Sequence, residues 1–347
     1  MVSHAAKLHH YVPQGYLRGF AAGKNQIRVT PLDSNRSPFT ASVKKVAAQT
    51  HFHTVAGAKE PDGFEKILSA VEGDAIGIIR RMEKGEFPLP EEDRTALSFY
   101  FALQAVRGPD TRKTIETLRA KLIRVEVGAG GRKNLKTWIK RNLGFEPTQE
   151  QEQLIWEEAT QPGGPQLTFP VSVHIDHMVS TAEYLTKYLL TRPWCLVRFD
   201  RRSLITCDAP VSLIRNPNDD SWMGVGVGFG TAWGISVPIS RKLGLLMSDP
   251  TVMINHLEAQ DPKLQEIRDL VVSGRADRTE AGTTAMERLF NEHTAESARE
   301  YVYCHPDDAQ FIPSELHEPT LINADIGGLF DAEFDGQPWF GEAQAAP

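Results

Sequence analysis

Apolar side chains recur at three- and four-residue spacing over residues 63–83, which is the period of one buried face of an α-helix. A second run, from about Glu91 to Val106, is apolar over most of its length and begins with acidic side chains, which the positive end of a helix dipole favours. The pattern predicts two consecutive helices, the second of them central to the fold. Helical periods also predict helices at 111–127, 133–143, 148–159, 175–190, 262–273, 281–291 and 295–303.

Alternating polar and apolar positions predict a strand at 26–30, and strand-like runs predict others at 194–199, 203–206 and 233–239, with Asp200-Arg201-Arg202 as the turn of a hairpin. The predicted fold class is therefore α+β, mainly helical with a small antiparallel β-sheet. We expect one large domain over residues 1–310 and a loosely packed tail over 318–347. Within the domain we expect an irregular and β segment at 1–60, a helical core at 63–190, the hairpin region at 194–240 and C-terminal helices at 260–305.

The composition is that of an ordinary globular protein, with 41% hydrophobic and 24% charged residues in a chain of 347. No apolar run approaches the roughly 18–20 residues that span a bilayer, and the first residues lack the pattern of a signal segment. Cys195, Cys207 and Cys304 stand apart, without the spacing of a zinc site or a disulfide framework. These features predict a cytoplasmic protein with no membrane partner.

The net charge of −7 argues against phosphate-backbone binding over a broad surface, because such binding needs a surplus of Lys and Arg. A basic segment nevertheless runs from Arg112 to Arg141. The favoured interpretation of this segment is a helix pair with solvated positive faces. Local contact between an enzyme site and a nucleic acid or nucleotide is compatible with this charge.

The adjacent imidazoles of His9 and His10 precede Pro13, which restricts the backbone and cannot donate a hydrogen bond. Neighbouring residues of an extended segment point to opposite sides, so we expect one imidazole to face a site and the other to anchor the segment. A purely structural pair is the alternative. Two other histidine pairs rank below this one as metal ligands. His51 and His53 lie two apart on a presumed extended segment and are expected to point the same way, and His174 and His177 lie three apart near a predicted helix start.

Polar side chains interrupt the two long predicted helices. Glu65 and Glu72 are two turns apart and share a face beside the apolar stripe, where a carboxylate needs a cation, a hydrogen bond or a metal. Gln104 and Arg107 lie three apart near the end of the second helix, and Arg107 could bind either glutamate or an anionic substrate. Asp208 ends a predicted strand, a place for a catalytic carboxylate or a plain Asx-turn.

These segments together resemble an uncharacterised bacterial family, domain of unknown function four-two-three-eight. Its members open with His-His-Tyr-Val-Pro-Gln, an aromatic-Leu-Arg and Phe, as His9 to Phe20 do here. Two positions depart from the family pattern: Cys207 stands where Ser is usual, and Ala209 where Asn is usual. The other similar segments are Phe64-Glu65-Lys66 with Glu72, Gln104 to Pro109 with Arg112, Asp208 to Val211 and Val237 to Ser240. The family carries no established reaction, so the resemblance implies candidate residues and no mechanism.

Imidazoles, carboxylates and an arginine are the groups used for metal-assisted or general acid–base attack on a phosphodiester. We therefore expect a metal-dependent hydrolase, either a nuclease or a nucleotide hydrolase. The type of family adds the expectation of a toxin or phage-defence effector. In this hypothesis Mg²⁺ or Mn²⁺ is held by Glu65, Glu72 and Asp208. The expected catalytic residues are His9, His10, Gln14, Gln104 and Arg107.

Two other functions are compatible with the same residues. The cluster could be a buried polar network that stabilises a non-catalytic fold, in which case every member must be hydrogen-bonded. It could also be the site of a sensor that binds an anionic small molecule at Arg107 without turnover. The sequence gives no indication of the oligomeric state.

Overall fold

The structure is a computed structural model, and it describes residues 8–217, 226–255, 257–258, 260–322 and 332–339. The chain divides into two compact units. The first combines residues 1–109 with 170–320, and the second combines 110–169 with 321–347. The predicted single domain spans 1–310, whereas residues 110–169 here group with the chain that follows residue 320. Within the described ranges, no helix is both long enough and apolar enough to cross a bilayer.

The first unit contains a five-stranded sheet with the order β10-β5-β9-β8-β7. Its pairs are antiparallel except for β10 and β5, which run parallel. The α+β class is thus confirmed, and the sheet is larger than predicted because it also includes two strands that follow the 194–240 region. The strands are β5 (Trp194–Arg198), β7 (Ser212–Ile214), β8 (Gly234–Ser240), β9 (Leu243–Ser248) and β10 (Arg278–Ala281).

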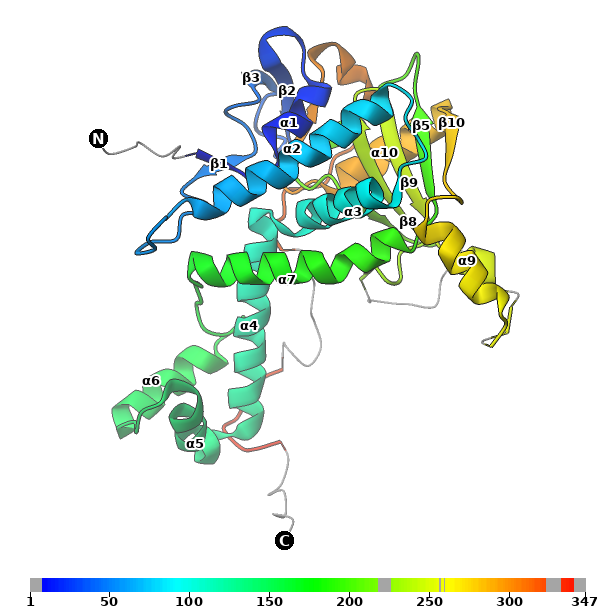
Figure 1. Ribbon diagram of the computed structural model, residues 1–347. Coiled ribbons are helices and arrows are strands. Elements are labelled where there is room, and N and C mark those ends of the chain that lie inside the picture. The colour runs from blue at the N-terminus through cyan, green and yellow to red at the C-terminus, as the bar shows by residue number, and fades with distance from the viewer. Residues whose placement is uncertain (1–7, 218–225, 256, 259, 323–331, 340–347) are drawn as a thin grey trace. The chain divides into compact units, whose positions relative to one another are not determined.

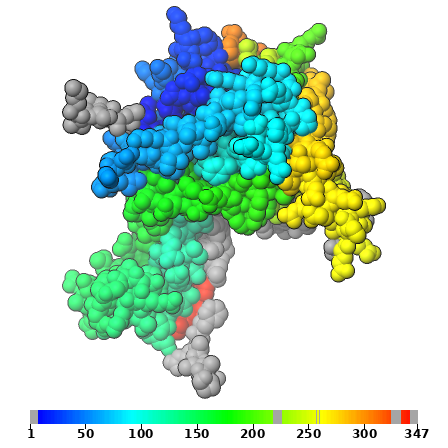
Figure 2. All heavy atoms as spheres, in the orientation of Figure 1, coloured from blue at the N-terminus to red at the C-terminus, as the bar shows by residue number. Residues whose placement is uncertain are grey.

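Helices cover both faces of this sheet (Figure 1). Successive residues of β5 point to opposite faces: Trp194 and Leu196 join the core beneath α2, α3 and α7, whereas Cys195 and Val197 join the core that contains Phe290 of α10. In the space-filling view, side chains of α2, α3 and α7 hide most of the sheet (Figure 2). The helices are α2 (Gly63–Glu83), α3 (Glu91–Val106), α7 (Val171–Leu190) and α10 (Thr284–Ser297). The predicted bounds of the first two are confirmed.

Two smaller antiparallel sheets lie in the same unit. One has the order β3-β2-β11-β6, and the other pairs β1 with β4 so that His9 lies opposite Gln49. Their strands are β1 (Leu8–His10), β2 (Gln26–Pro31), β3 (Phe39–Ser42), β4 (Ala48–Thr50), β6 (Thr206–Cys207) and β11 (Tyr301–Cys304). Short helices complete the unit: α1 (Gln14–Leu17), α8 (Thr251–Ile254), α9 (Lys263–Val272) and 3-10 turns at Arg18–Phe20, Gly23–Asn25 and Pro306–Phe311.

Two predicted elements are wrong. The segments predicted to form a hairpin around Asp200 belong to different sheets, because β5 pairs with β9 and β10 while β6 pairs with β11. The predicted helix at 295–303 is the end of α10 followed by β11, and Ala298 between them is extended (φ −57°, ψ 149°). Val302 to Cys304 are buried without alternation, and so short an apolar run does not distinguish a strand from a helix by its period.

The second unit is helical. Its core is formed by Val127, Leu135, Ile139, Trp156 and Ala159. Phe334, from the tail predicted to be loosely packed, packs against this core and stacks on Trp339. A side chain at Gly128 would collide with the Phe334 ring, so glycine is required there. The helices are α4 (Pro109–Gly130), α5 (Arg132–Leu143) and α6 (Gln149–Thr160).

Candidate metal centre

The first strand orients the two adjacent imidazoles. Pairing of β1 with β4 holds the backbone extended, so His9 and His10 have different partners on either side of the strand. His9 is buried at 2% exposure. The Nε2 of His10 donates to the carbonyl of Val43 at 3.3 Å, and its Nδ1 accepts from Gln14 Nε2 at 3.5 Å. Burial lowers the pKa of His10, which keeps this imidazole neutral.

Three side chains that can ligate a metal converge next to this strand. His9, His53 and Glu65 each place a ligand atom within 4.8 Å of the other two. The Nδ1 of His53 is hydrogen-bonded to Glu65 Oε1, and the Nδ1 of His9 lies 3.7 Å from the same oxygen. The two imidazole rings stack at 5.9 Å with 12° between their planes. Among the described residues, this is the one group of three His, Cys, Asp or Glu side chains whose ligand atoms lie that close together.

A tight turn brings His53 into the cluster. His51 has a φ of +57°, which breaks the alternation of an extended segment. His51 is therefore exposed and contacts Thr54, whereas His53 is fully buried against the rings of Phe52 and Phe64. The expectation that His51 and His53 point the same way is wrong for this reason. His53 carried little weight as a metal ligand in the sequence because His9, His53 and Glu65 lie on different segments, so no regular spacing connects them.

Hydrogen bonds set the proton positions of the pair. The backbone N–H of His53 donates to His9 Nδ1 at 2.9 Å, so a neutral His9 carries its proton on Nε2. That Nε2 lies 3.6 Å from Asp62 Oδ1, which also accepts from the Thr54 hydroxyl at 2.7 Å. The side chains of Asp62 and Glu65 are 25% and 28% exposed, so the carboxylate side of the cluster is reached by solvent. A ligand can therefore approach from this side.

The pKa of Glu65 reflects opposing influences. Burial alone would raise the pKa of its carboxyl group. The hydrogen bond and charge of His53, with the charges of His9 and Arg107, outweigh burial and hold this pKa below its ordinary value. Glu65 is thus an anion at neutral pH, as a metal ligand must be.

Arg107 joins three elements beside the cluster. Its Nη1 donates to Glu72 Oε1 at 2.8 Å, and its Nη2 donates to the carbonyl of His10 at 2.6 Å. Burial raises the pKa of Glu72 despite the opposing charge of Arg107. Gln14 accepts from Arg18 at 3.3 Å and so extends the same set of contacts. Glu72, predicted as a metal ligand, is the partner of an arginine.

Asp208 has a different role from the other two acids. Its Oδ1 accepts from the backbone N–H of Arg299 at 2.7 Å, and its Oδ2 accepts from Glu300 at 2.7 Å and Tyr301 at 3.1 Å. These bonds hold the turn that leads into β11. The predicted ligand set of Glu65, Glu72 and Asp208 therefore does not assemble around one point, because each carboxylate is held by different partners. His9 and His53 accompany Glu65 instead.

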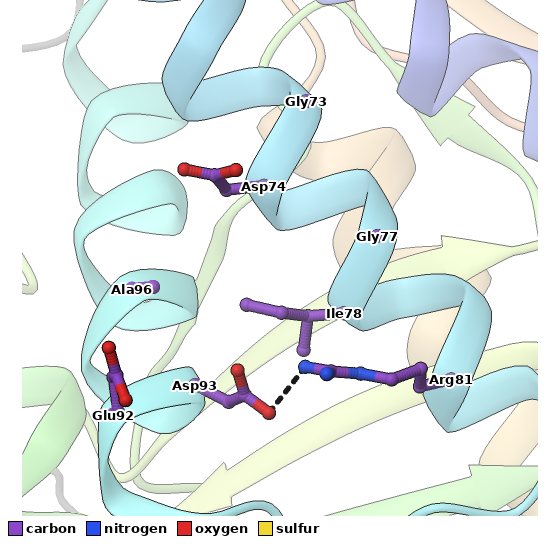
Figure 3. A pocket seen from close by; sticks show the side chains of 8 residues that line it. All are labelled: Gly73, Asp74, Gly77, Ile78, Arg81, Glu92, Asp93 and Ala96. Atoms are coloured by element: carbon purple, nitrogen blue, oxygen red, sulfur yellow. Dashed lines mark hydrogen bonds and ion pairs between the residues drawn. The ribbon is translucent and has the colours of Figure 1, made fainter.

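A hollow between α2 and α3 lies further along these helices (Figure 3). Arg81 and Asp93 form an ion pair across it. Its lining includes none of the residues predicted for the site. The lining residues are Gly73, Asp74, Gly77, Ile78, Arg81, Glu92, Asp93 and Ala96. The cluster of His9, His53 and Glu65 is the stronger candidate because its side chains are metal ligands by type and geometry.

Comparison with known proteins gives the family of the chain. Neither the curated proteins nor the solved structures contain a significant match. A family model described as "Protein of unknown function (DUF4238)" matches residues 8–308, a stretch that includes every residue of the cluster. The chain belongs to this family, as the His9 to Phe20 motif indicated.

Proposed function

We propose that the chain is a metal-dependent hydrolase that cleaves a phosphodiester. The observation that carries this proposal is the convergence of His9, His53 and Glu65 within 4.8 Å. Two imidazoles and one carboxylate are a ligand set of catalytic zinc and manganese sites, and three protein ligands leave coordination positions for water and substrate. The exposed side at Asp62 and Glu65 gives that substrate a route of approach.

The donor atoms select the metal. Two imidazole nitrogens suit Zn²⁺ better than Mg²⁺, which prefers oxygen ligands in octahedral geometry, and the carboxylate of Glu65 is a ligand that Mn²⁺ also accepts. A divalent ion held by His9, His53 and Glu65 would supply Lewis-acid activation of a water for attack on the phosphodiester. The nearby charge of Arg107 would favour a phosphodiester anion over a neutral ester.

A non-catalytic polar network is the second candidate, and one contact favours it. His9 Nδ1 already accepts the His53 backbone N–H at 2.9 Å, so a metal at that nitrogen would have to replace a hydrogen bond. If this bond is the purpose of the pair, both histidines stabilise the fold and bind nothing. The two candidates therefore make opposite predictions for added metal.

Hydrolysis of bis(4-nitrophenyl) phosphate tests the proposal. The protein is stripped with a chelator and assayed with Zn²⁺, Mn²⁺ or Mg²⁺. We expect hydrolysis with Zn²⁺ or Mn²⁺, its loss in Glu65→Gln, and no change in His51→Gln, because His51 is exposed outside the cluster. Metal-independent turnover would contradict a metal-dependent mechanism, and no turnover with any of the three ions would argue for the structural network.

A further inference from the structure

Helix α3 carries a buried polar face next to the candidate metal centre. Tyr100, Gln104 and Arg107 are 0%, 4% and 3% exposed. Their spacing of four and then three residues places them on one face of the helix. The rest of this stretch is apolar, so the three polar side chains form a defined patch within the core.

The patch has hydrogen-bonding groups that the protein does not use. Within the described ranges, Tyr100 Oη, both polar atoms of the Gln104 amide and Arg107 Nε have no hydrogen-bond partner. Buried polar atoms are almost always paired, because an unpaired one forfeits its bonds to water. Four unpaired atoms at consecutive positions of one helix face indicate a partner that is not part of the protein.

The patch adjoins the candidate metal centre through Arg107. Both Nη atoms of Arg107 are bonded, one to Glu72 and one to the carbonyl of His10, so the guanidinium is fixed and its Nε cannot turn to another partner. The charges of Glu72 and Arg107 both act on the Tyr100 hydroxyl, which places that hydroxyl near them. His10 directly follows His9 in β1. A ligand of the patch would lie beside the centre.

The chemistry of the unpaired atoms describes the ligand. A glutamine amide presents a donor and an acceptor side by side in one plane, which is the pattern that pairs with the edge of a nucleobase. The Tyr100 hydroxyl can donate or accept, and Arg107 Nε can only donate. The amide and the hydroxyl are uncharged, so these two groups select a polar planar group over a phosphate or a metal ion.

We propose that Tyr100, Gln104 and Arg107 Nε form a subsite for the nucleobase of a nucleotide. This inference rests on the proposed function, since it supplies the base of the phosphodiester that the centre would cleave. Gln104 is then a binding residue that selects the substrate. Without a ligand, the unpaired amide of Gln104 destabilises the folded state, and a bound base would supply the missing hydrogen bonds.

Equilibrium binding to the chelator-treated protein tests the subsite separately from hydrolysis. The probes are AMP, GMP, CMP and UMP, with ribose 5-phosphate as the control that lacks a base. We expect at least one nucleotide to bind about tenfold or more tightly than ribose 5-phosphate. We expect Gln104→Met and Tyr100→Phe each to weaken that nucleotide by about 10- to 100-fold, the range for a lost specific base contact. Gln265→Met, at an exposed site on α9, should leave binding unchanged.

Thermal unfolding of the same variants without ligand completes the test. If the subsite serves a ligand, Gln104→Met keeps or raises the melting temperature, because it removes unpaired buried atoms. Equal affinity for all nucleotides and ribose 5-phosphate would overturn the inference, as would a Gln104→Met variant that melts lower and binds normally. Base-selective binding without hydrolysis would leave the subsite standing and remove the proposed hydrolase.

Discussion

Arg94 and Asp277 form an ion pair in which both side chains are fully buried, although 183 positions of chain separate them. The guanidinium of Arg94 also lies 4.1 Å from the centre of the Trp194 ring and donates to the carbonyl of Arg192 at 2.6 Å. Asp277 accepts from the backbone N–H of Trp194 at 2.8 Å. The pair therefore ties the start of α3 to β5 and to the chain before β10.

Replacing Asp277 with Asn should destabilise the protein by about 3–5 kcal/mol, because it leaves the Arg94 charge buried without a counter-charge. Urea unfolding measures this loss. The matched control is Asp93→Asn, whose partner Arg81 is 43% exposed and whose ion pair is worth about 0–1 kcal/mol. Similar losses in the two variants would contradict the prediction.

Added metal should stabilise the protein through His9. A ligand that binds only the folded state at about 100 times its dissociation constant adds about 2.7 kcal/mol to the free energy of unfolding. We expect Zn²⁺ or Mn²⁺ to raise the melting temperature of the wild type and of His51→Gln, but not of His9→Gln. If metal leaves the wild-type melting temperature unchanged, the histidine pair is structural.

The Glu72 carboxyl should make stability fall as pH rises. Burial raises the pKa of Glu72, so the folded state binds this proton more tightly than the unfolded state. Its contribution is complete below the unfolded pKa and is lost as pH rises through the folded pKa. Relative to Glu72→Gln, which does not titrate, the wild type should lose stability as pH rises above the ordinary glutamate pKa of about 4. Urea unfolding of both proteins at each pH gives the free energy of unfolding of the wild type minus that of the variant. A value that rises with pH would contradict the prediction.

Asp208→Asn should cost stability and leave metal binding intact. The carboxylate accepts three backbone N–H groups at the turn into β11, and the amide can accept at one of its two oxygen positions only. We expect a loss of about 1–3 kcal/mol from the donors left unpaired. The metal-induced shift in melting temperature should match that of the wild type. Loss of that shift in a folded variant would return Asp208 to the ligand set.

Helices were accessible from the sequence because their signal is local. The apolar period of α2 and the acidic start of α3 lie within the helices themselves, and their predicted bounds agree with the structure. Strand pairing depends on distant chain instead. The partner of β5 on one side is β10, about 80 positions later by the pairing of Cys195 with Arg278, and nothing in either strand specifies the other. The predicted hairpin failed for this reason.

The candidate site was accessible in part. His9 and Glu65 were selected because polar side chains beside apolar surroundings need partners, and the structure brings these two together. His53 was underrated because its direction depends on the positive φ of His51, which no residue pattern signals. Asp208 was overrated because a carboxylate that caps a turn and one that binds a metal look the same in sequence.

The chain leaves the first unit after residue 109 and returns to it at residue 170, and α3 and α7 on either side of this excursion pack directly against each other. The helix layer that covers the sheet is thus complete without residues 110–169. Insertions and replacements at such a junction are tolerated when the parent layer keeps its own contacts. Residues 110–169 are therefore the part of the chain whose replacement should disturb the layer over the sheet, and the histidine cluster beside it, the least.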